Sequence, residues 1–224
     1  MPPTSLSGIC DALCKTFEND THTIFDIGMM APQGPSYVAR KTNEYVQKQM
    51  DAEAFDEVVF VGESWGADIG IMVSERLAHS SIVIAGEPSE AGFHAEDEVW
   101  RARMHEQWLR FGPHLKKMGP IAMKAMDSNW GWLGPQETWK RINNLHTLEK
   151  RAIIIAGFGG QQPSIETTLK LNDFYALRAK SNLQCFNFSG GGHRVLNREA
   201  AKIAGLTLAI LNPSGNAQPD NPGP

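Results

Sequence analysis

The stretch that decides the fold is residues 58–70, VVFVGESWGADIG. Its apolar beginning is typical of a buried strand, and it stops at Gly62. Ser64 then stands between Gly62 and Gly66 in the pattern G-x-S-x-G, and the residues after it favour a helix. A serine on a sharp turn between a strand and a helix is typical of a nucleophile elbow, and the alternative is an ordinary strand-to-helix turn.

Short apolar segments alternate with helical patterns over most of the chain. Continuous apolar strands separated by helices indicate an α/β fold, a mostly parallel sheet flanked by helices on both faces. Ligands of such sheets bind at the carboxyl ends of the strands. We predict strands at Thr23–Ile27, Val58–Val61, Ser81–Ala85, Ala152–Ala156 and Gln184–Phe188, and helices at Ser7–Glu18, Val38–Ala52, Ala67–Leu77, Ile165–Lys180 and Arg198–Leu211.

Composition excludes several classes of function. The chain has 224 residues, a net charge of −4 and no basic block, which argues against nucleic acid as a partner. It contains no apolar run long enough to cross a membrane, and its first residues lack the pattern of a signal peptide. Cys10 and Cys14 lie four residues apart on a predicted helix and are interpreted as core thiols, without a third ligand for a metal. We therefore expect a cytoplasmic protein that contacts no membrane and needs no metal or cofactor.

One interval breaks the alternation of strands and helices. Residues 88–149 contain no evident strand but hold five of the six tryptophans and several methionines. We predict a helical cap there, inserted between core segments 1–87 and 150–211, and a disordered tail at 212–224. The alternative is that these side chains form the packing of an extra helical layer. If the cap lines an apolar pocket, the candidate substrate-binding residues are Trp130, Trp132 and Trp139.

A nucleophilic serine needs a base, and the best candidate is His193. The order expected for this arrangement is serine, acid, histidine along the chain. His193 follows the last predicted strand through a glycine loop, SGGGHRVL, and no other histidine comes directly after a strand. The backbone N–H of Trp65, at the start of the helix after Ser64, can donate to a developing oxyanion.

The acid is harder to assign. The strand before the histidine strand ends in GFGGQQ, which offers no carboxylate, and the next acid, Glu166, already lies in a predicted helix. One strand earlier, IVIAGE places Glu87 directly after a strand end, where a carboxylate can orient the histidine ring. We therefore rank Glu87 above Glu166 and Asp173. The alternative for Glu87 is a solvated loop residue or the cap of a helix.

These segments resemble the α/β-hydrolase superfamily, and in particular its haloalkane dehalogenase and coelenterazine-luciferase branch. The similarity rests on TIFDIGMMAPQGPS, VVFVGESWGADIG with tryptophan after the nucleophile, IVIAGE, AGFGGQQPSIETTLKL and SGGGHRVL, and it covers most of the chain outside a shorter cap. It implies the same triad, Ser64, His193 and Glu87, with an oxyanion donor at Trp65. That branch uses aspartate as nucleophile, so Ser64 implies acyl transfer and not dehalogenation.

The printed sequence lacks a counterpart of the family's first strand and His-Gly turn. That turn supplies an oxyanion donor in the family, whereas this chain has Pro2 and Pro3, which carry no N–H. Either Thr23–Ile27 pairs directly with Val58–Val61, or another chain completes the sheet, so a homodimer is a candidate partner. We expect a serine hydrolase for an apolar carboxylic ester, thioester or lactone. The alternatives are a non-catalytic hydrolase-like protein that binds a small apolar ligand or a partner, and a lyase or cyclase on the same fold.

Overall fold

The computed structural model describes residues 6–17, 34–53, 57–86, 135–157, 182–189 and 194–211, together with a few positions between 96 and 106. Within these residues, four strands form one sheet in the order β1-β2-β3-β4, and every neighbouring pair is parallel. The strands are β1 (Glu57–Glu63), β2 (Ser80–Gly86), β3 (Arg151–Ala156) and β4 (Leu183–Asn187). Four of the predicted strands are thus confirmed, and the fifth, Thr23–Ile27, lies outside the described residues.

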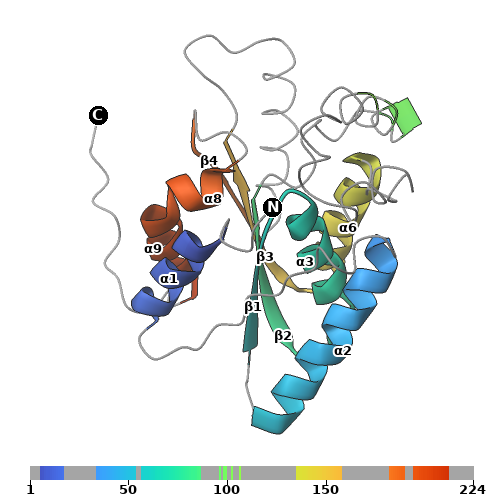
Figure 1. Ribbon diagram of the computed structural model, residues 1–224, viewed down its shortest axis with the longest axis horizontal. Coiled ribbons are helices and arrows are strands. Elements are labelled where there is room, and N and C mark those ends of the chain that lie inside the picture. Colours follow the sequence, from blue (N-terminus) through green and yellow to red (C-terminus); the bar gives the residue numbers. More distant parts are fainter. Residues whose placement is uncertain are drawn as a thin grey trace, which may run out of the picture.

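The helices cover both faces of the sheet, as predicted, with α1, α8 and α9 on one side and α3 and α6 on the other (Figure 1). Helix α8 has no counterpart among the predicted helices, and α6 lies within the segment 88–149 that was predicted to be helical. The predicted helix Ile165–Lys180 lies outside the described residues. The helices are α1 (Ser7–Thr16), α2 (Pro35–Glu53), α3 (Trp65–Arg76), α6 (Pro135–Thr147), α8 (Val195–Arg198) and α9 (Ala200–Leu211).

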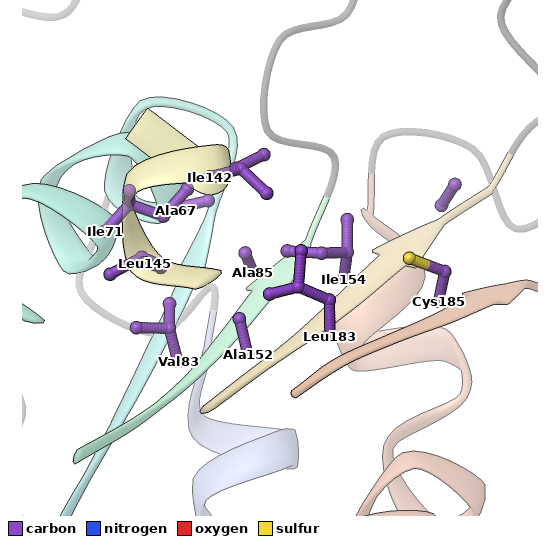
Figure 2. Close-up of a cluster of buried hydrophobic side chains, with 11 residues drawn as sticks. Ala67, Ile71, Val83, Ala85, Ile142, Leu145, Ala152, Ile154, Leu183 and Cys185 are labelled. Carbon is purple, nitrogen blue, oxygen red and sulfur yellow. The ribbon is translucent and has the colours of Figure 1, made fainter. Parts of the chain in front are cut away.

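The two hydrophobic clusters follow the alternation of side chains along the strands. Val83 and Ala85 of β2 face α3 and α6, in a cluster that includes Ile142 and Leu145 of α6 (Figure 2). Ile82 and Ile84 face the opposite way, toward α1, α8 and α9. Since successive side chains of a strand point to opposite faces, the continuous apolar run from Ile82 to Ala85 buries both faces of β2.

Helix α3 is buried along most of its length, because α2 covers the side that faces away from the sheet. Residues 67–74 are all buried, and Val38 and Ala39 of α2 pack against Ile69, Met72 and Val73 of α3. The helix is therefore fixed between the sheet, α2 and α6. This environment holds the segment that begins at Ser64 in one position.

Two parts of the predicted domain organisation fall largely outside the described residues. The tail at 212–224 is one, and residues 88–134 of the predicted cap are the other. Helix α6 belongs to the segment that we assigned to the cap, yet it packs on α3 and contributes to the cluster on the sheet. The cap and its boundaries stay a prediction. No helix in the described ranges is long and apolar enough to cross a membrane.

Candidate active site

Ser64 has an unusual backbone conformation at the junction of β1 and α3. Its φ is 55° and its ψ is −124°, and it directly precedes the first residue of α3. A positive φ is uncommon for residues with a Cβ, and this ψ lies outside the left-handed helical region as well. Backbone strain of this kind is concentrated at functional sites, where the surrounding structure must hold it. The turn is therefore a strained elbow and not an ordinary strand-to-helix connection.

The turn is possible because Gly62 has no side chain. A Cβ at Gly62 would lie 2.2 Å from the carbonyl oxygen of Gly66 and 2.6 Å from the nitrogen of Ala67. Both are backbone atoms of the helix, so neither can move aside cheaply. A Cβ at Gly66 would meet no described atom within 4 Å. We expected both glycines to let the strand and the helix approach each other closely. The structure requires a glycine for this at position 62, where the backbone of Gly66 approaches the strand.

Hydrogen bonds fix the elbow from both sides. The N–H of Ser64 donates to the carbonyl of Gly86 at 2.7 Å, at the carboxyl end of β2. The carbonyl of Ser64 accepts from the N–H groups of Ala67 and Asp68, at 2.9 and 3.3 Å, and so closes the first turn of α3. Glu87, the predicted acid, is the next residue after Gly86 but lies outside the described residues.

Helix α8, which follows the predicted base, returns the chain to this elbow. A Cβ at Gly86 would lie 2.5 Å from Cγ of Leu196, so this leucine packs directly on the end of β2. The N–H of Leu196 donates to Oε1 of Glu63, the residue before Ser64, at 3.4 Å. His193 itself lies outside the described residues. Leu196, three positions further on, therefore contacts the residues that flank Ser64 in sequence and in space.

Only some of the predicted tryptophans can be located. Trp65 is the first residue of α3 and packs, partly buried, against the cluster that α2 and α3 share. Trp139 lies in α6 and packs, also partly buried, against the cluster on the sheet. Trp130 and Trp132 lie outside the described residues. The roles of Trp65 in oxyanion binding and of the other three in substrate binding stay predictions.

The main electrostatic feature beside the elbow is Asp68, in the first turn of α3. Its side chain is buried, and Oδ1 accepts a hydrogen bond from Oγ1 of Thr138 in α6 at 3.2 Å. The pKa of Asp68 is raised to about 8, and the main cause is desolvation by burial. The hydrogen bond from Thr138 and the charge of Arg141 act in the opposite direction, and the charge of Glu137 raises the pKa further. A carboxyl group with this pKa carries its proton at neutral pH for most of the time.

A groove of about 780 Å³ runs along α6, but its character differs from that of the predicted pocket. Its lining consists of polar and charged side chains, namely Glu75, Gln136, Glu137, Lys140, Arg141, Asn143, Asn144 and Thr147. Glu75 lies near the end of α3 that is remote from Ser64. The apolar pocket above Ser64 stays a prediction. The described residues contain no cluster of histidine, cysteine and carboxylate side chains suited to a metal ion.

Sequence reasoning missed two residues that the structure brings to the elbow. Glu63 occupies a variable position of G-x-S-x-G, so the motif gives no reason to single it out. Asp68 did carry a signal, since it is an acid within the otherwise apolar run from Ala67 to Val73. An isolated carboxylate in such a run indicates either the first turn of a helix or a buried group with a hydrogen-bond partner. Asp68 lies in the first turn of α3 and is also buried against Thr138.

Comparison with known proteins supports the fold. No family model and no curated protein matches the chain in sequence. Among solved structures, the chain is similar to MenH from S. aureus, with a TM-score of 0.57 and 12% identity over 94% of this chain and 90% of that one. It is also similar to a lipase-esterase related protein from Clostridium acetobutylicum, with a TM-score of 0.51 and 14% identity over 89% and 87% of the two chains. At such identities the likeness shows the fold alone, and that fold is the α/β-hydrolase fold predicted from the sequence.

Proposed function

We propose that the protein is a serine hydrolase that cleaves a carboxylic ester, thioester or lactone with an apolar group. The observation that carries the proposal is the backbone of Ser64, held at a φ of 55° between a strand and a buried helix. Strain of this kind costs free energy without a benefit to folding, and an elbow that presents a nucleophile accounts for it. The α/β-hydrolase fold adds the chain order in which acid and histidine follow the serine.

In the proposed reaction, Oγ of Ser64 attacks the carbonyl carbon while His193 takes the hydroxyl proton. The carbonyl π electrons move to the oxygen, and the oxyanion accepts a hydrogen bond from the N–H of Trp65, at the positive end of α3. The oxyanion then collapses, and the leaving group departs with the proton from His193. Water, deprotonated by His193, releases the acid from the acyl-enzyme and restores Ser64. Glu87 orients the ring of His193.

Two contacts near the elbow support this assignment of His193 and Glu87. Gly86 bonds to the backbone of Ser64, and Glu87 is covalently attached to it. Leu196 packs on Gly86, and His193 precedes Leu196 by three residues, a length of chain that spans at most about 11 Å. Both contacts support Glu87 and His193 as the acid and the base of the proposed triad.

The experiment is labelling with a fluorophosphonate, followed by hydrolysis of p-nitrophenyl esters of rising acyl length. We expect rapid labelling of Ser64, loss of both activities in Ser64→Ala and His193→Ala, and a smaller kcat in Glu87→Gln. Ser36→Ala, at an exposed serine of α2, is the matched control and should behave as the wild type. We expect kcat/KM to rise with acyl length, because the predicted pocket is apolar. A folded wild type that neither labels nor hydrolyses any ester would favour the ligand-binding alternative.

A further inference from the structure

The interface between α3 and α6 has different chemistry at its two ends. At its centre, Ala67 and Ile71 of α3 pack with Ile142 and Leu145 of α6 (Figure 2). At the end remote from Ser64, Glu75 accepts hydrogen bonds from Arg141 at 2.7 Å and from Asn144 at 2.9 Å. The end next to Ser64 instead holds a buried polar contact.

That contact joins Asp68 to Thr138. Both side chains are buried, at 5% and 0% exposure, and Oγ1 of Thr138 donates to Oδ1 of Asp68. The backbone N–H of the same aspartate donates to the carbonyl of Ser64. Asp68 is therefore linked at one end to the backbone of the nucleophile and at the other to α6. An unsatisfied polar group at such a position is costly, so the contact fixes the distance between the two helices at the elbow.

We propose that Asp68 is a positioning residue, whose hydrogen bond with Thr138 of α6 holds the first turn of α3 and thereby keeps Ser64 in its strained conformation. The proposal rests on the proposed function for its catalytic consequence, but its structural part concerns the backbone of the elbow alone. Asp68 acts through Ser64 and contacts no substrate in this assignment. Helix α6 thus becomes part of the support of the nucleophile.

The charge state of Asp68 decides how well this support works. Burial raises the pKa of Asp68 to about 8, so the carboxyl is largely protonated at neutral pH and ionises in mildly alkaline solution. Within the described part of the chain, the charged groups that act on it come from α6: Glu137 opposes the ionised form and Arg141 favours it. The other elements packed on α3, namely α2, β1 and β2, contribute no charge among the causes of this shift. Ionisation would place a poorly compensated charge between the helices and loosen the elbow.

The test compares five proteins: wild type, Asp68→Asn, Thr138→Val, Thr138→Ser and Glu75→Gln. Asparagine imitates the protonated acid and still accepts from Thr138, valine removes the donor at constant shape, and serine restores it. Glu75→Gln is the control, because it weakens the same interface at the end remote from Ser64. Two readouts are measured between pH 6 and 9.5. They are the protection of the Ser64, Ala67 and Asp68 amides against hydrogen exchange, and the rate of Ser64 labelling by a fluorophosphonate.

We expect Thr138→Val to lower the protection of these amides at least about tenfold and to slow labelling on the order of ten- to a hundredfold. With an ester as the substrate, the loss should appear mainly in kcat and not in KM. Thr138→Ser should recover most of both. Wild-type protection and labelling should fall above pH 8, and Asp68→Asn should lack that fall. Glu75→Gln should lower global stability without a selective effect at the elbow.

Equal protection of the elbow amides in wild type and folded Thr138→Val would overturn the proposal, as would a fall with pH that persists in Asp68→Asn. If the wild type is never labelled, the proposed function fails, and the exchange of the three amides still decides whether Asp68 positions the elbow.

Discussion

The strain at Ser64 predicts that removal of its Cβ stabilises the protein. In Ser64→Ala and Ser64→Gly the hydroxyl is lost equally, so the two variants differ only in the Cβ and in backbone freedom. A residue with a Cβ in a sparsely populated region such as φ 55° and ψ −124° costs roughly 1–3 kcal/mol. Glycine adopts that conformation without the steric cost.

An opposing term comes from the unfolded chain, where glycine has more conformational freedom than alanine, worth about 0.4–1 kcal/mol. With the middle of each range, the subtraction leaves Ser64→Gly more stable than Ser64→Ala by about 1.3 kcal/mol. For a chain of 224 residues, each kcal/mol shifts Tm by roughly 2–4 °C. The difference is therefore measurable by urea unfolding and by calorimetry.

The control for this prediction is a pair of variants at an ordinary helical position. Lys48 is exposed in the middle of α2, where the backbone is helical. Glycine there should be less stable than alanine by about 1 kcal/mol, the opposite sign to that at Ser64. The elbow would not be strained if Ser64→Gly were no more stable than Ser64→Ala while Lys48→Gly was less stable than Lys48→Ala.

The remaining predictions concern the surroundings of the elbow. Gly62→Ala should destabilise the protein by about 3 kcal/mol and abolish labelling, because the new Cβ would lie 2.2 Å from a backbone oxygen. Gly66→Ala lies in a helix, and its new Cβ would meet no described atom within 4 Å, so it should be neutral or slightly stabilising. Gly86→Ala should slow Ser64 labelling by more than it lowers Tm, because Leu196, 2.5 Å from the new Cβ, must move and take α8 with it. Asp68 should make stability fall between pH 3.8 and about 8, because its buried carboxyl keeps a proton that the unfolded chain loses. The free energy of unfolding of Asp68→Asn minus that of the wild type should therefore rise with pH, by at most about 1.4 kcal/mol per pH unit. Urea unfolding at several pH values measures this difference. A difference independent of pH would contradict the burial of an ionisable Asp68.

Much of the fold could be predicted because parallel strands that are buried on both faces are continuous apolar runs in the sequence. The apolar runs at Val58–Val61, Ser81–Ala85 and Ala152–Ala156 predict strands without knowledge of their partners, and the structure has them with ends shifted by one or two residues. The elbow was predictable for the same reason. Its two glycines, nearly all of its strand and the first half of its helix lie within residues 58–70.

Helix α6 lies within the helical cap predicted at 88–149, but its packing on α3 was not predicted, because its apolar stripe is narrow. Its buried apolar residues are Ile142 and Leu145, and Trp139 is partly buried. Charged and amide side chains lie between them, and the remaining buried side chain is a threonine. A pattern of this kind is typical of an exposed helix or a loop. The packing of α6 on α3 is a tertiary fact, since it depends on segments 60 to 75 residues apart, and no local pattern encodes it.

The role of Asp68 was unpredictable for a related reason, and that reason bears on function. Local rules favour an acid in the first turn of a helix, where the dipole and free N–H groups stabilise its charge. The structure instead buries Asp68 and supplies a hydroxyl from α6, so desolvation outweighs the dipole and the carboxyl holds its proton at neutral pH. A polar pair buried at the support of a strained serine is a poor choice for stability alone, since an apolar pair would fill the space at less cost. Its position argues that the α3–α6 contact serves the geometry of Ser64, and that α6 is as much a part of the candidate active site as the strand that carries the nucleophile.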